Sequence, residues 1–332
     1  MKTPATSQTV TLIFTLLLVP SIFAGDIRLS TNTVITFASV EGGKKILTSR
    51  DDFVSALSPF DRASRMKTDQ EVSEGDYLGF VGQSVMPWAT EETNKITGIF
   101  RSLGKTLAAW NLPFPSTILL IKTSGREEGN ASYTRQNAII LCERDIQSAG
   151  PKLNDLITHE LFHVLSRQNP SLRKNLYHII GFNPISAVEF PEELRQRKIT
   201  DPDGVQNNWF INVTNQGRTL PVVPILYASA SHYDLNQGGE FFNYLVFKFL
   251  VVTNGDVRRM PRLVEGRSQL LDPGEIEGFF EQVGNNTSYI IHPDEILADN
   301  FVLLINEKTN PPTPRIVTDM KKVFREQDLK AR

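Results

Sequence analysis

The sequence contains a single cysteine, Cys142, so no disulfide can form within the chain. Net charge is also small: 35 Lys and Arg oppose 37 Asp and Glu, which gives −2. This balance argues against a protein that binds nucleic acid through bulk positive charge. Long apolar runs are absent beyond the first thirty residues, which excludes a protein with several transmembrane helices. With 40% hydrophobic residues, the 332-residue chain can still build a substantial core.

The one long apolar run, Val10–Val19, lies near the N-terminus and is too short to span a bilayer comfortably. Lys2 is the only charged residue before it, Pro20 ends it, and Ala24 offers a small residue for cleavage. These features predict a signal peptide over residues 1–24. The mature protein would then be secreted or periplasmic, with no stable membrane insertion. An uncleaved N-terminal anchor and an apolar strand are the alternatives.

The remaining chain has no repeat, low-complexity tract or linker, which predicts one domain over 25–332. We expect an α+β fold with a strand-rich part over about 25–148 and a largely helical part over about 149–332. Strands are predicted at 117–121 and 138–142, forming a hairpin, and at 209–213 and 220–227. Helices are predicted near 51–58 and at 91–110, 152–167, 171–181, 241–252, 275–283, 293–305 and 316–328.

A complete His-Glu-x-x-His motif occupies residues 159–163, inside one of these predicted helices. Residues four apart share a helix face, so His159 and His163 can bind one Zn²⁺ ion together. Glu160 lies about a hundred degrees around the helix, where it can contact a metal-bound water instead of the metal. We therefore expect Glu160 to act as general base. The alternatives are two ordinary hydrogen-bonded histidines, or a metal site without hydrolytic activity.

Catalytic zinc sites usually have three protein ligands, so a third must come from elsewhere. Glu295 is favoured, because it opens a predicted helix and Asp299 follows four residues later on the same face. Asp299 would accept the far N–H of a ligand histidine. Glu240 is the rival, but it has Tyr244 in place of the second acid. Both candidates remain open here, as does an ordinary surface helix whose first-turn acids favour its dipole.

Hydrolysis of a peptide bond also needs a hydrogen-bond donor that stabilises the negative charge developing on the carbonyl oxygen. His232 and Tyr233 are candidates because they are adjacent, polar and in a predicted loop, although Tyr233 can equally cap the following helix. The strand Ala138–Cys142 lies just before the motif helix and could present an edge to an extended peptide.

At these residues the chain resembles the zincin metallopeptidases of the gluzincin type. Those enzymes combine His-Glu-x-x-His on one helix with a glutamate on a second helix, often as Glu-x-x-x-Asp. The resemblance assigns His159, His163 and Glu295 to the metal and Glu160 to catalysis, with Asp299 as the trailing acid. It implies an α+β zincin fold whose sheet packs on the motif helix. The metzincin pattern does not fit, because Ser166 and Asn169 replace its glycine and third histidine.

Together these observations predict a secreted or periplasmic zinc-dependent peptidase that acts on a peptide or protein substrate and binds no nucleic acid. The alternative is a catalytically inactive secreted protein that binds metal or peptide on the same scaffold.

Overall fold

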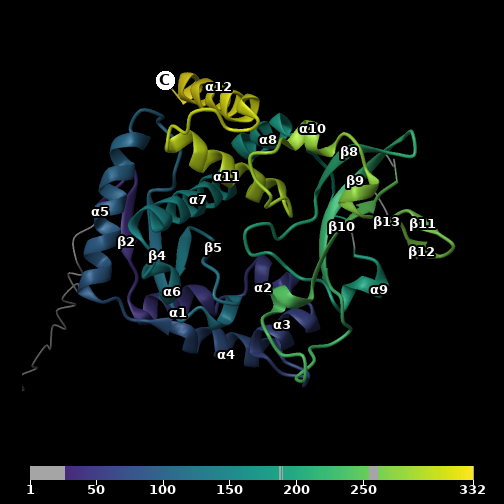
Figure 1. Ribbon diagram of the computed structural model, residues 1–332. Coiled ribbons are helices and arrows are strands. Elements are labelled where there is room, and N and C mark those ends of the chain that lie inside the picture. Colours follow the sequence, from purple (N-terminus) through teal and green to yellow (C-terminus); the bar gives the residue numbers. More distant parts are fainter. Residues whose placement is uncertain (1–26, 187, 189, 254–260, 332) are drawn as a thin grey trace, which may run out of the picture.

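The computed structural model describes residues 27–331, apart from residues 187, 189 and 254–260 (Figure 1). The predicted signal peptide, residues 1–24, lies outside the described residues. The described chain is a mixture of helices and two main sheets, as expected for an α+β protein. Within it, no helix has the length and apolar character needed to cross a membrane.

The first sheet has the strand order β1-β2-β4-β6-β5, with β3 paired to β4. Strands β2, β4 and β6 are parallel to one another, whereas β1, β3 and β5 pair antiparallel. The strands are β1 (Ile27–Arg28), β2 (Val34–Phe37), β3 (Val85–Met86), β4 (Thr117–Thr123), β5 (Tyr133–Arg135) and β6 (Ala138–Cys142).

Helices cover both faces of this sheet. The strands β4 and β6 carry apolar side chains on both faces, so both faces have to be buried. Ile118 and Ile139 face a core that also contains residues of α5 (Thr90–Leu107) and α7 (Gly150–Gln168). Ile121 and Ile140 face a second core, with α1 (Val40–Leu47), α2 (Asp52–Ala56) and α4 (Glu74–Ser84). All four strand residues are at most 1% exposed.

The predicted hairpin of residues 117–121 and 138–142 is wrong. These strands are parallel, because β5 and the 3₁₀ helix η1 (Arg126–Glu128) lie between them in the sequence and β5 turns back antiparallel on β6. Strand β6 is therefore inside the sheet, and β5 is its edge. The predicted edge at Ala138–Cys142 is likewise wrong.

The second sheet has the order β13-β10-β9-β8-β7. Its strands are β7 (Asn183–Pro184), β8 (Trp209–Asn215), β9 (Arg218–Ala228), β10 (Leu245–Val251) and β13 (Leu270–Leu271). A separate small pair contains β11 (Leu263–Val264) and β12 (Arg267–Ser268). The strands expected near 209–213 and 220–227 are confirmed as β8 and β9.

The helix predicted over 241–252 is wrong, as is the expectation of a largely helical C-terminal half. Only Phe241–Tyr244 forms a 3₁₀ helix, η2, and the rest is β10. By periodicity, the apolar run fits a helix and a buried strand equally well. It forms a strand because β10 pairs with the long strand β9. In the N-terminal part, α1 to α4 replace the single helix expected near 51–58; α3 spans Pro59–Met66.

The other helices agree with the sequence pattern or are short additions, except that the helix predicted over 275–283 forms only in its last five residues. They are α6 (Glu143–Ile146), α8 (Pro170–Ile179), α9 (Glu192–Arg195), η3 (Pro273–Glu275), α10 (Phe279–Val283), α11 (Pro293–Ile305) and α12 (Pro314–Ala331).

Helices α7 and α11 lie side by side and carry the residues of interest (Figure 1). Pro151 stands in the first turn of α7 and Pro293 in that of α11, where proline suits the helix start. His292 caps α11 by accepting a hydrogen bond from the backbone N–H of Asp294 at 3.1 Å. Ala298 is fully buried, and the absence of a larger side chain there favours close approach of the two helices.

Candidate metal centre

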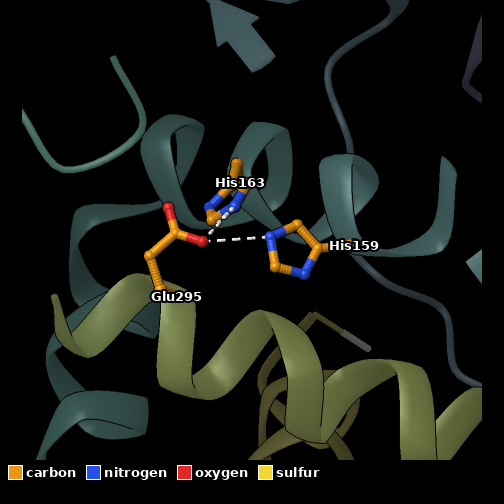
Figure 2. A group of neighbouring side chains, drawn as sticks. All are labelled: His159, His163 and Glu295. Atoms are coloured by element: carbon orange, nitrogen blue, oxygen red, sulfur yellow. Dashed lines mark hydrogen bonds and ion pairs between the residues drawn. The ribbon is translucent and has the colours of Figure 1, made fainter. Parts of the chain in front are cut away.

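The side chains of His159, His163 and Glu295 converge between α7 and α11. Figure 2 shows the Glu295 carboxylate pointing from α11 towards both imidazoles on α7. Glu295 Oε2 lies 3.0 Å from His159 Nε2 and 3.5 Å from His163 Nε2. One potential ligand atom of each residue lies within 4.8 Å of the others, which is compatible with a shared metal ion. The structure therefore brings together the three residues that the sequence analysis named.

Each histidine is held from its far side by a carboxylate. His159 Nδ1 lies 2.9 Å from Asp299 Oδ1, the contact expected for Asp299. His163 Nδ1 lies 2.8 Å from Asp294 Oδ2. In neutral imidazoles, these partners favour a proton on Nδ1 and leave Nε2 as the ligand atom. Thr287 in turn donates a hydrogen bond to Asp299.

Sequence analysis missed Asp294 and the two hydroxyls that support it. Asp294 is buried, and its Oδ1 accepts hydrogen bonds from Ser166 Oγ at 2.5 Å and Tyr177 OH at 2.6 Å. The local signals were weak: Asp294 precedes Glu295 directly, and Ser166 follows His163 by three residues on α7. Only the packing of α7, α8 and α11 shows that these groups meet.

The imidazoles and acids of the cluster shift one another's pKa values. Burial lowers the pKa of His159, but hydrogen bonds to Asp299 and Glu295 raise it to about 10. Burial also opposes charge on His163, yet the neighbouring Glu295 charge raises its pKa well above the ordinary value. Burial likewise opposes ionisation of Glu295, while the charge of His163 holds the pKa of that carboxyl well below its usual range. Without a metal, protons on the imidazoles balance the carboxylate charge.

Glu160 is the remaining residue of the motif, and it lies beside the cluster without joining its hydrogen bonds. Its side chain is 2% exposed, and Oε2 has no hydrogen-bond partner. Burial, and next the charge of Asp203, raises the pKa of this carboxyl to about 8. A buried, unpaired carboxyl group is costly unless it has a ligand or a proton to hold. This position suits a proton acceptor.

The loop between α9 and β8 adds two acids that no sequence pattern indicated. Asp203 lies with Glu160 and His163 in one group of potential ligand atoms, and with Asp201 and Glu295 in another. Asp203 also accepts hydrogen bonds from the backbone N–H of Thr134 at 3.1 Å and from Arg167 at 3.3 Å. This loop therefore covers the outer edge of β5 at Thr134, next to the motif helix.

Tyr289 is a further residue that sequence analysis missed. Its ring stacks on that of His159, with centroids 6.5 Å apart, in the loop just before α11. Partial desolvation of the hydroxyl, and then the charge of Glu295, raise the pKa of Tyr289, so the hydroxyl keeps its proton and can donate a hydrogen bond. Tyr289 lines a cavity of about 520 Å³ together with His159, Glu160 and Glu295.

The other candidates from the sequence have different surroundings. Glu240 forms an ion pair with Lys67 at 2.7 Å and accepts a hydrogen bond from Asn130. Tyr233 is buried and donates to the carbonyl of Gly239 at 2.8 Å, and the exposed His232 contacts Ser231. None of their described contacts reaches His159, His163 or Glu295, whereas Glu295 and Tyr289 both lie beside His159.

Comparisons of the chain with protein-family models, with curated proteins and with solved structures give no match.

Proposed function

We propose that this protein is a zinc-dependent peptidase. The observation that carries the proposal is the convergence of His159, His163 and Glu295 next to the unpaired carboxyl group of Glu160. Two imidazoles and one carboxylate form a ligand set used by catalytic zinc. The motif order and the Glu295–Asp299 spacing are also those of the gluzincins, and we extend the proposal to a zincin-like fold.

The residues present fit a metal ion on two grounds. His163 Nε2 and Glu160 Oε2 are buried polar atoms without hydrogen-bond partners, which a bound ion and its solvent would satisfy. Asp299 and Asp294 hold the far nitrogens of the two imidazoles, a support that histidine ligands of metals commonly have. His159, His163 and Glu295 would hold the ion.

When bound, Zn²⁺ would supply a Lewis acid that favours deprotonation of water and polarises a carbonyl group. Glu160 would take the proton of the attacking water and later deliver it to the leaving amine. Its burial and unpaired oxygen leave it free for both steps. Asp299 and Asp294 would keep the imidazoles in one orientation throughout.

The surroundings offer a place for an extended peptide. The cavity of about 520 Å³ is lined by His159, Glu160 and Tyr289, and also by Ala131 and Ser132, which directly precede the edge strand β5. The Tyr289 hydroxyl would donate a hydrogen bond to the carbonyl oxygen as negative charge develops on it. We also propose that the signal peptide directs the enzyme to a secreted or periplasmic location.

Replacement of Glu160 by Gln tests this function. The zinc-loaded variant should lose about 10²–10⁴-fold in kcat/KM on a peptide-library digest, because a general base is removed while the metal ligands stay. Glu91→Gln, an exposed change on α5, is the matched control and should cleave like wild type. Full activity of the Glu160 variant would contradict the mechanism. Zinc binding by wild type without cleavage of any peptide would favour the inactive metal- or peptide-binding alternative.

A further inference from the structure

A second polar cavity, of about 450 Å³, lies behind the Asp203 loop and is distinct from the one that contains Glu160. It is found between the end of β5, the end of α7, helix α8 and the start of β8. The residues that line it include three arginines, Arg135, Arg167 and Arg173, and the rings of Tyr177, Trp209 and His292.

The three arginines differ in how their charge is balanced. Arg135 forms an ion pair with Asp51, and Arg167 forms one with Asp203. Among the described residues Arg173 has no carboxylate partner, and its buried Nε makes no hydrogen bond. A guanidinium that is partly buried without an acceptor is unfavourable, so the cavity is suited to an anionic group brought from outside.

The aromatic side of this cavity is closely packed. Tyr177 packs edge-on against Trp209, with ring centroids 4.6 Å apart, and its hydroxyl is fixed by Asp294. Gly204 lies so close to His292 that a Cβ atom there would be 2.5 Å from Cγ of the ring. Side chains that are already packed lose little entropy when a ligand binds beside them.

This cavity adjoins the one that contains Glu160. Asp203 lines both cavities, and the short strand β5 connects them, with Ser132 before it at one and Arg135 at the other. A peptide that binds across Glu160 and continues past Asp203 would therefore place a side chain or its terminus near Arg173.

We propose that this second cavity is a substrate subsite that binds a carboxylate of the peptide, with Arg173 as its counter-ion. The proposal rests on the peptidase function proposed above. A guanidinium binds a carboxylate through two parallel hydrogen bonds, and Asp51, Asp52 and Asp203, which also line the cavity, disfavour groups with higher negative charge. The carboxylate belongs to an internal Asp or Glu, or to the C-terminus of a peptide.

Matched peptides distinguish these sources. One pair, amidated at the C-terminus, carries Glu or Gln at the preferred position found by a library digest; a second pair differs only in a free or amidated C-terminus. We expect wild type to favour the carboxylate member of at least one pair by about tenfold or more in kcat/KM, because a charged partner left unpaired is costly. Arg173→Gln should reduce this ratio to about one. Lys174→Gln removes one positive charge from an exposed position on the same helix and should leave the ratio unchanged.

A binding measurement separates this subsite from the peptidase function. Calorimetry with zinc-loaded Glu160→Gln protein should show tighter binding of the same carboxylate peptide, and Arg173→Gln in that background should abolish the difference. If wild type cleaves nothing but this binding preference holds, the peptidase function fails and the subsite stands. Equal treatment of both members of each pair, or a preference that survives in folded Arg173→Gln protein, would overturn the subsite.

Discussion

Asp294 is the buried carboxylate on which the orientation of His163 depends, and its replacement by Asn gives a specific test of the site's architecture. Its two oxygens receive three hydrogen bonds, from His163, Ser166 and Tyr177. Hydrogen bonds to a charged acceptor contribute about 1.5–3 kcal/mol, against about 0.5–1.5 kcal/mol for neutral pairs. Loss of the charge should thus cost about 1 kcal/mol per bond, or about 2–3 kcal/mol in free energy of unfolding.

The Asn side chain should also affect the metal. Its oxygen can keep the two hydroxyl donors, and its NH₂ group would then donate to His163 Nδ1. That places the remaining proton of the neutral ring on Nε2, the atom that should bind the metal. We expect zinc affinity to fall by about 10–100-fold, measured by competition with a chelator.

Asp299→Asn is the matched control, because Asp299 makes the same kind of contact with His159 but its side chain is 36% exposed. Solvent can replace the lost interaction there, so the unfolding free energy of the metal-free protein should change by less than about 1 kcal/mol. Urea denaturation of both variants with chelator present measures the difference. Equal destabilisation by the two replacements, or unchanged zinc affinity in Asp294→Asn, would refute this reasoning.

Four further predictions concern zinc affinity, proton release, the pH dependence of stability and the buried charges. Asp299→Asn should lower zinc affinity by about 10–100-fold, again by chelator competition, since it removes the partner of His159 Nδ1; an unchanged affinity would exclude that role. Zinc binding at pH 7 should release about two protons, because the pKa values of both imidazoles are raised, that of His159 to about 10, and both must deprotonate to bind metal. Calorimetry in buffers of different ionisation enthalpy counts them, and no release would contradict the shifts. The raised pKa of His159 also stabilises the metal-free fold. This contribution is fully present at pH values below about 6.5, the pKa of histidine in the unfolded chain, and should disappear as the pH rises through about 10. Arg65→Met should lower the free energy of unfolding by about 3–5 kcal/mol, measured by urea denaturation, because it leaves Asp61 and Glu128 buried without their partner. The control Arg101→Met, at an exposed position, should change it by less than about 0.5 kcal/mol. Similar losses for both variants would refute the argument.

The sequence predicted the cluster of His159, His163 and Glu295 because most of its signals are local. His159, Glu160 and His163 share one helix, and Glu295 and Asp299 share another, so helical periodicity places each set on a face. The groups that surround the cluster come from elements far apart in the chain. Asp203 reaches Glu160 from a loop, and Tyr289 reaches His159 from the residues before α11. Their positions depend on tertiary packing, which spacing within one segment does not encode.

The errors in the fold have a similar cause. The apolar residues of 241–252 fit a helix and a buried strand equally well, and only pairing with β9 selects the strand. The strands at 117–121 and 138–142 were identified, but their direction depended on the placement of β5 between them. By contrast, α7 and α11 combine a proline at the start with a regular apolar face, and both were predicted within about two residues.

Measurement of metal content tests the central claim most directly. Elemental analysis of protein purified without chelator should find about one zinc per chain in wild type and in Glu240→Gln, the rival carboxylate that pairs with Lys67. Glu295→Gln should retain little zinc after dialysis, because it removes the ligand that faces both imidazoles. Absence of a stoichiometric transition metal from wild type, or full zinc retention by Glu295→Gln, would contradict the account.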